Sequence, residues 1–203
     1  MLGINLRKRW AQLRYLVRSD LCRHGQDLSA RAFWYHYIRT PGFRFMVWHR
    51  FRAAIEGLPG VRFGFQQCIS WHLHSMAIRF GITLPVQCAV GPGFYIGHFG
   101  GIVIHQEVQL GRDCNVSQGV TVGLASRGKL FGCPIIGDRV YIGPGAKIFG
   151  KIVIGNDAAI GANAVVTRDV PAGAVVVGIP AKVISESGSC GYICNTHYGE
   201  PPP

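Results

Sequence analysis

One histidine stands in a glycine-rich turn where an imidazole could act as a base. His98 lies within the stretch Ile96-Gly97-His98-Phe99-Gly100-Gly101. Imidazole titrates near neutral pH, so it is the side chain best suited to take a proton from a hydroxyl group. Most single histidines are structural, but His98 falls on the same side of the predicted fold as a loop inserted after Gly123. This combination favours His98 as a general base.

Two further irregularities accompany His98. A two-residue slip in the surrounding repeat is placed at Ile104-His105-Gln106-Glu107, and an insertion runs from Gly123 to Ile135. When the slip is counted, His98 and Gln118 come to the same face of adjacent coils. Function in a repeat protein concentrates where the repeat is broken, so we expect the site on this face.

A six-residue repeat must position these groups. Between residues 84 and 183 an aliphatic residue returns every six positions, apart from the slip and the insertion. This period matches neither a helix face nor an alternating strand. Glycines that follow many of the aliphatic positions supply the positive φ angles of tight turns. The pattern predicts an all-β solenoid, a parallel β-helix in which each coil stacks its aliphatic residues on the previous one. Its aliphatic positions are Leu84, Val90, Ile96, Ile102, Leu110, Val116, Val122, Ile136, Ile142, Ile148, Ile154, Ile160 and Val166.

The positive charge lies almost entirely before the solenoid. Residues 1–80 carry 13 Lys and Arg against three Asp and Glu, whereas residues 81–203 carry eight against seven. A basic segment suggests an anionic partner such as a membrane surface or a polyanion. It contains no base-reading motif, so nucleic acid is not expected.

Hydrophobicity and cysteine content indicate the cellular compartment in which the protein is expected. The apolar runs are too short for a membrane span and no signal-peptide pattern begins the chain, which predicts a cytoplasmic protein. The seven cysteines are an odd number at mostly apolar positions, so reduced thiols are expected rather than disulfides.

Residues 1–80 are expected to form a small α-helical region before the solenoid. Helices are predicted over 4–18, from a Ser29 cap to 37, over 43–56 and over 62–80, with turns at Thr40-Pro41-Gly42 and Leu58-Pro59-Gly60. The chain thus divides into a basic, aromatic-rich helical region (1–80), the solenoid (81–184) and a tail (185–203).

The first helix is amphipathic, with Leu6, Trp10, Leu13 and Val17 on one face and basic residues off it. Such a helix is typical of peripheral membrane association. The alternative is that this apolar stripe packs on the protein itself or on a sister subunit. The tail contains Cys190, Cys194 and His197, which resemble a ligand set in spacing, but a mobile end is the preferred interpretation.

Several blocks of the solenoid resemble the serine acetyltransferase branch of the hexapeptide acyltransferases. They are 81–84, 96–104, 116–123, 128–129, 142–150 and 178–183. The resemblance implies a left-handed parallel β-helix, a homotrimer with active sites between subunits, and acetyl-CoA as the acetyl donor. It also implies that His98 is the catalytic base.

The same resemblance implies where acetyl-CoA binds. Residues 123–129 match the loop that closes over CoA, and residues 143–147 match the groove for its pantetheine arm. Cationic side chains near these segments suit CoA phosphates, although solvated loop charge is the alternative, and the backbone N–H groups of Gly119 or Gly123 suit a developing oxyanion. The predicted cofactor-binding residues are Gly119, Gly123, Arg127, Lys129, Gly143, Gly145, Ala146 and Lys147.

Departures from the family pattern suggest the acceptor. Thr83 and Gly97 stand where the family has aspartates, and Cys133 stands where it has a histidine that holds the amino acid. A free serine needs opposing charges in its site, so their loss favours a sugar hydroxyl, as in the exopolysaccharide or capsule (colanic-acid-type) O-acetyltransferases. Thr83, Gly97, Gln118 and Cys133 are the predicted substrate-binding positions.

Three other functions remain open. The first is serine O-acetyltransferase activity. The second is a lyase of the γ-carbonic-anhydrase type, but His98 and His105 are the only solenoid histidines and cannot supply three metal ligands, so no metal is expected. The third is a non-catalytic scaffold. Direct transfer without an acyl-enzyme is preferred, because no cysteine has a histidine beside it in sequence.

Overall fold

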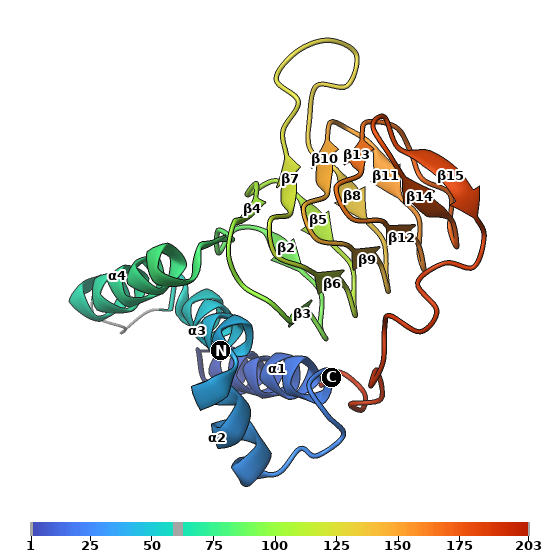
Figure 1. Cartoon of the computed structure of the whole chain (residues 1–203). Helices are drawn as coiled ribbons and strands as arrows, with labels where there is room; N and C mark the ends of the chain where they lie inside the picture. Colours follow the sequence, from blue (N-terminus) through green and yellow to red (C-terminus); the bar gives the residue numbers. More distant parts are fainter. Residues whose placement is uncertain (1, 59–62, 203) are drawn as a thin grey trace.

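The computed structural model describes residues 2–58 and 63–202, and it contains the predicted solenoid as three sheets, parallel throughout except for the antiparallel last strand, β15 (Figure 1). The first sheet contains β1 (Ile82–Thr83), β4 (Ile102–Ile104), β7 (Thr121–Gly123), β10 (Lys147–Phe149) and β13 (Val165–Val166). The second contains β2 (Ala89–Val90), β5 (Gln109–Leu110), β8 (Ile135–Ile136) and β11 (Val153–Ile154). The third contains β3 (Tyr95–Ile96), β6 (Asn115–Val116), β9 (Tyr141–Ile142), β12 (Ala159–Ile160), β14 (Val175–Val177) and β15 (Lys182–Ser185).

The repeat positions form the core, as predicted. Ile96, Ile142 and Ile160 are buried, and so are the small residues four positions later in the repeat, such as Ala146 and Ala164. Small residues fit there because successive coils leave little room inside the prism. Removing a large aliphatic side chain from water stabilises the fold by about 1.5–3 kcal/mol, and the repeat multiplies that gain.

The two-residue slip lies elsewhere than predicted. Ile104, not Ile102, pairs with Val122 in the first sheet, and Val103 pairs with Thr121. The two additional residues therefore belong to the turn between β3 and β4, which contains His98. The prediction at 104–107 was wrong because Ile102 and Ile104 are both buried, and spacing alone cannot tell which of them continues the column.

The helical region contains α1 (Leu2–Cys22), α2 (Ala30–Arg39), α3 (Pro41–Ile55) and α4 (Phe63–Phe80). The Ser29 cap is confirmed, since its hydroxyl accepts a hydrogen bond from the N–H of Ala32. Pro41 begins α3 rather than ending a turn, because the first helical position needs no N–H donor. The predicted turn at Pro59-Gly60 and the helix start at Arg62 lie outside the described residues.

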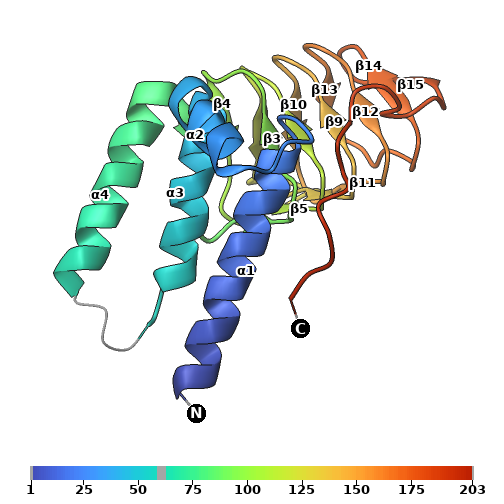
Figure 2. The same ribbon diagram turned by 90° about the horizontal axis from the view of Figure 1, so that it is seen from below.

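The helices pack against the first coil, with α1, α3 and α4 side by side (Figure 2). A Cβ at Gly42 would lie 2.4 Å from the carbonyl oxygen of Ile96, so only glycine allows α3 to approach β3 so closely. Arg50 of α3 also bonds the Asp20 carboxylate, at 3.0 Å, and the carbonyl oxygen of Val90, at 2.6 Å. This buried pair fixes the helices to the solenoid.

The apolar stripe of α1 is partly used inside the protein. Leu13 and Val17 line an apolar hollow with Trp48 of α3, and the Trp10 ring lies 6.1 Å from that of Phe51. The structure thus favours the alternative in which the stripe packs on its own protein, while Trp10 remains partly exposed. No helix in the described ranges is both long and apolar enough to cross a bilayer.

The tail is packed, contrary to the prediction of a mobile end. It runs back from β15 towards α1 (Figure 1). Tyr198 is only 3% exposed, and its hydroxyl donates to the Asp113 carboxylate at 3.3 Å. Arg23, directly after α1, donates to the carbonyl oxygen of Cys194 at 2.8 Å. Sequence reasoning missed this because the partners are far away in the chain.

Candidate functional site

His98 occupies the lengthened turn between β3 and β4. Its side chain is exposed, as a base that must meet a substrate requires. The turn is fixed on both sides, since the N–H of Ile102 donates to Gly81 and the N–H of Gly119 donates to Gly100. A rigid turn holds an imidazole in place without a side-chain partner.

The backbone N–H of Gly119 already donates a hydrogen bond within the fold. It donates to the carbonyl oxygen of Gly100 at 2.8 Å, which ties the His98 turn to the next coil. The prediction that it serves as an oxyanion donor is corrected, because an N–H engaged within the fold is not free for a reaction intermediate. Gly123 lies on β7 opposite Phe149, and its role stays a prediction.

Lys147 is also held by the fold. Its Nζ donates to the carbonyl oxygen of Gly119 at 2.6 Å and to the hydroxyl of Thr121 at 3.0 Å. Its ammonium group is therefore held beside the start of β7 and does not point freely into solvent. A role with a CoA phosphate remains a prediction, and it would require Lys147 to share these hydrogen bonds.

The residues at 143–146 present backbone rather than side chains. Gly143 donates its N–H to Ile160, Gly145 donates its N–H to the carbonyl oxygen of Gln118, and the Ala146 methyl group is fully buried in the core. The side chain of Gln118 itself is exposed beside the His98 turn. Any contact of 143–146 with a pantetheine arm would therefore involve main-chain atoms, the two glycines and the half-buried Pro144 ring.

The inserted loop projects from the prism, as predicted (Figure 1). Ala125 and Gly132 exchange two backbone hydrogen bonds, at 3.0 and 3.1 Å, so the loop is a short hairpin. Arg127 and Lys129 are exposed at its tip. The prediction that His98 and the inserted loop share one side of the fold is corrected. The His98 turn precedes β4 and the hairpin follows β7, so the two lie at opposite ends of the strands of the first sheet.

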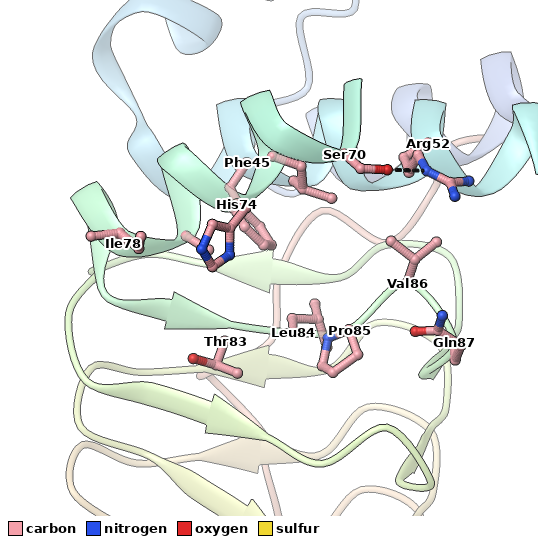
Figure 3. Close-up of a pocket in the computed structure, with 12 residues that line it drawn as sticks. Phe45, Arg52, Ser70, His74, Ile78, Thr83, Leu84, Pro85, Val86 and Gln87 are labelled. Carbon is pink, nitrogen blue, oxygen red and sulfur yellow. Dashed lines mark hydrogen bonds between the residues drawn. The ribbon is translucent and has the colours of Figure 1, made fainter. Parts of the chain in front are cut away.

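A groove lies between the helices and the first coil, close to Thr83 (Figure 3). It has a volume of about 390 Å³. Arg52 of α3 bonds the Ser70 hydroxyl at 2.8 Å, and its Nη1 has no partner among the described residues. His74 of α4 points towards the coil near Thr83 (Figure 3). Polar groups from the helices thus share the groove with a predicted acceptor-site residue.

The space beside Gly97, which stands where the family has an aspartate, is occupied by the side chain of a neighbouring residue. A Cβ on Gly97 would lie 2.8 Å from Cε1 of Tyr95. The Tyr95 ring in turn lies 4.7 Å from that of His24. The aromatic ring therefore takes the space where a longer side chain at position 97 would begin.

The structure brings together one group that sequence reasoning missed. Cys133, at the foot of the hairpin, has its Sγ 3.2 Å from Nδ1 of His105, and Glu107 is the third member of the cluster. No histidine lies beside Cys133 in the sequence. Cys133 and His105 are 28 residues apart in the sequence, and they come into contact because they lie at neighbouring corners of adjacent coils.

Known proteins are similar to this chain in sequence and in fold. The bacterial transferase hexapeptide family (six repeats) matches residues 133–168. A serine acetyltransferase of Helicobacter pylori (strain J99) is 36% identical over 163 residues, which cover 79% of this chain and 91% of that protein. The chain belongs to the serine acetyltransferase family. The exopolysaccharide branch is not supported.

Solved structures of the serine acetyltransferase family have the same architecture. The Neisseria gonorrhoeae serine acetyltransferase in complex with serine has a TM-score of 0.68 and 28% identity, covering 86% of this chain and 69% of that chain. The Brucella abortus serine acetyltransferase in complex with coenzyme A has a TM-score of 0.68 and 25% identity, covering 87% and 68%. The hexapeptide-repeat fold with a helical N-terminal region is thus common to them.

The prediction of a sugar acceptor was wrong, since relatives that cover most of the chain are serine acetyltransferases. It rested on the loss of charged groups at Thr83, Gly97 and Cys133. Acceptor specificity depends on groups that converge in space, and polar side chains of the helices share the groove near Thr83. The prediction considered only positions in the solenoid, so it left out these side chains of the helices.

Proposed function

We propose that this member of the family is a serine O-acetyltransferase that uses acetyl-CoA as its donor. The observation that carries the proposal is the 36% identity that extends over 91% of a curated serine acetyltransferase, with the His98 turn and the hairpin both present. Similar structures hold serine in one case and coenzyme A in another. Because acetyl-CoA and free serine are cytoplasmic metabolites, the predicted cytoplasmic location agrees with this function.

In the proposed reaction His98 is the general base. Its imidazole takes the proton of the serine hydroxyl, the oxygen attacks the thioester carbonyl of acetyl-CoA, and the C–S bond breaks. The proton returns from His98 to the sulfur of the leaving CoA. A well-placed base of this kind typically contributes about 10²–10⁴-fold in rate. The exposed, rigid turn supports this role.

The hairpin is proposed to cover the donor. Arg127 and Lys129 at its tip suit CoA phosphates by charge, and their exposure leaves them free to do so. A homotrimer with sites between subunits is proposed with it, because His98 and the hairpin lie at opposite ends of the strands of one sheet. In such an assembly the His98 turn of one subunit would meet the hairpin of the next.

The test is release of CoA thiol from acetyl-CoA in the presence of L-serine, with L-alanine as the matched acceptor that lacks only the hydroxyl group. We expect saturable turnover with L-serine and O-acetylserine as the product by mass spectrometry. Thiol release that is no faster with L-serine than with L-alanine would refute the serine assignment.

A further inference from the structure

A cluster of three different ligand types lies at the corner where the hairpin rejoins the solenoid. The Sγ of Cys133, a ring nitrogen of His105 and a carboxylate oxygen of Glu107 all lie within 4.8 Å of one another. Among residues 2–58 and 63–202 it is the one group of three or more such side chains at this spacing. Glu107 is exposed, while His105 and Cys133 are partly buried.

The distances fit a tetrahedral metal ion. With Zn–S near 2.3 Å and Zn–N near 2.0–2.1 Å, two ligands at a tetrahedral angle are about 3.5 Å apart. The observed separation of Cys133 Sγ and His105 Nδ1 is 3.2 Å. The Glu107 carboxylate needs only a small movement to complete the set, which its exposed side chain permits. Thiolate, imidazole and carboxylate together suit zinc rather than magnesium or calcium, which prefer oxygen ligands.

An activated nucleophilic thiol is the other chemistry that a Cys–His pair suggests. A nucleophilic cysteine needs its pKa lowered by a positive neighbour. Here the neighbouring charge is the negative Glu107 carboxylate, which lies within 4.8 Å of the Cys133 sulfur. Glu107 therefore works against a thiolate nucleophile, whereas it is a useful third ligand for a divalent cation.

We propose that His105, Glu107 and Cys133 form a zinc site, with the fourth position taken by water. The ion would join the foot of the hairpin, which contains Cys133, to the preceding coil, which contains His105 and Glu107. The expectation of no metal rested on the number of histidine ligands alone. The mixed set needs one histidine, and the solenoid supplies it.

Binding is tested with Zn²⁺ and with Co²⁺ as a spectroscopic probe, on the full chain after treatment with a chelator. We expect one equivalent of tightly bound Zn²⁺ per chain. Co²⁺ should give a sulfur-to-metal charge-transfer band in the near ultraviolet, which only a thiolate ligand produces. At one hundred times its Kd, Zn²⁺ should raise the melting temperature by about 5–10 °C. None of these measurements depends on acetyl transfer, so they stand apart from the proposed function.

Variants assign the ligands. Cys133→Ser and His105→Gln should each lose the Co²⁺ band and the thermal shift, and Glu107→Gln should weaken binding at least about tenfold. Cys190→Ser and His197→Gln are the matched controls, because both side chains are exposed in the tail. Melting of each chelated variant shows whether it folds. A wild-type chain that binds less than half an equivalent of Zn²⁺, or a folded Cys133→Ser chain that keeps the Co²⁺ band, would overturn the proposal.

Discussion

The ring of Tyr95 lies directly against Gly97, where a Cβ would be 2.8 Å from its Cε1 atom. The next residue in the chain is His98, so this contact defines the shape of the turn that presents the proposed base. We expect Gly97→Ala to lower the free energy of unfolding by about 1–3 kcal/mol through overpacking. Chemical denaturation of the single and double variants with Tyr95→Ala measures the coupling. An equal cost of Gly97→Ala in both backgrounds would contradict the contact.

Loss of the proposed base should stop catalysis without unfolding the protein. His98→Ala should lower kcat by about 10²–10⁴-fold, because no other described histidine occupies this turn. Its melting temperature should remain within about 1 °C of wild type, since an exposed side chain adds little to the core. Steady-state kinetics and a melting curve check both parts, with His197→Ala as control. A variant that keeps more than a tenth of the wild-type kcat would exclude His98 as the base.

The tip of the hairpin should affect the donor and not the acceptor. Replacing both Arg127 and Lys129 by Gln should raise KM for acetyl-CoA about tenfold, equivalent to about 1.4 kcal/mol, and leave KM for serine unchanged. The increase should shrink at high salt, since exposed charges are screened. Lys182→Gln, an exposed lysine on β15, is the control. An unchanged KM for acetyl-CoA in the double variant would leave these charges as solvated loop residues.

The tail should contribute to stability. Tyr198→Ala removes a buried ring whose hydroxyl bonds Asp113 and also accepts a hydrogen bond from Arg112, at 3.1 Å. We expect a loss of about 3–5 kcal/mol in the free energy of unfolding, as for other large aromatic residues. Limited proteolysis should then cut the tail faster. Glu200→Ala, at an exposed position, should behave as wild type in both measurements.

Stability should fall in mild acid because of a buried histidine. Burial lowers the pKa of His49 to about 4, with the charge of Arg50 adding to the effect, while an unfolded histidine titrates near 6.5. The unfolded chain therefore takes up the proton first. The contribution of His49 is complete above pH 6.5 and is lost as pH falls from 6.5 to about 4, by an amount on the order of 3 kcal/mol.

The control for this effect keeps the polar contact but not the titration. His49→Gln can still donate to the carbonyl oxygen of Pro85, which lies 3.2 Å from the imidazole Nε2. Unfolding free energies of both chains between pH 4 and pH 7 should show a shallower slope for the variant. Burial also lowers the pKa of His24, to about 4, and the pKa of His36, so both add to the slope in the two chains. Parallel slopes for the two chains would contradict the assignment to His49.

The solenoid could be predicted from the sequence, because a six-residue period with glycine turns buries residues such as Ile142 and Ile148 in a regular stack of coils. The sequence also indicated the Ser29 cap and the projecting hairpin, which are local features that depend on neighbouring residues. His98 could be singled out for the same reason, since its turn breaks the repeat.

Contacts between residues of different coils could not be predicted from the sequence. The choice between Ile102 and Ile104 for the core column, the use of the Gly119 N–H within the fold, and the contact of Cys133 with His105 all depend on the register of one coil on the next. The tail packs through contacts such as the hydrogen bond from Arg23 to Cys194, and these two residues are more than 170 positions apart in the sequence. Periodicity fixes which side chains face inward, but contacts between distant segments depend on how turns of unequal length shift one coil against another, and spacing along the chain does not contain that shift.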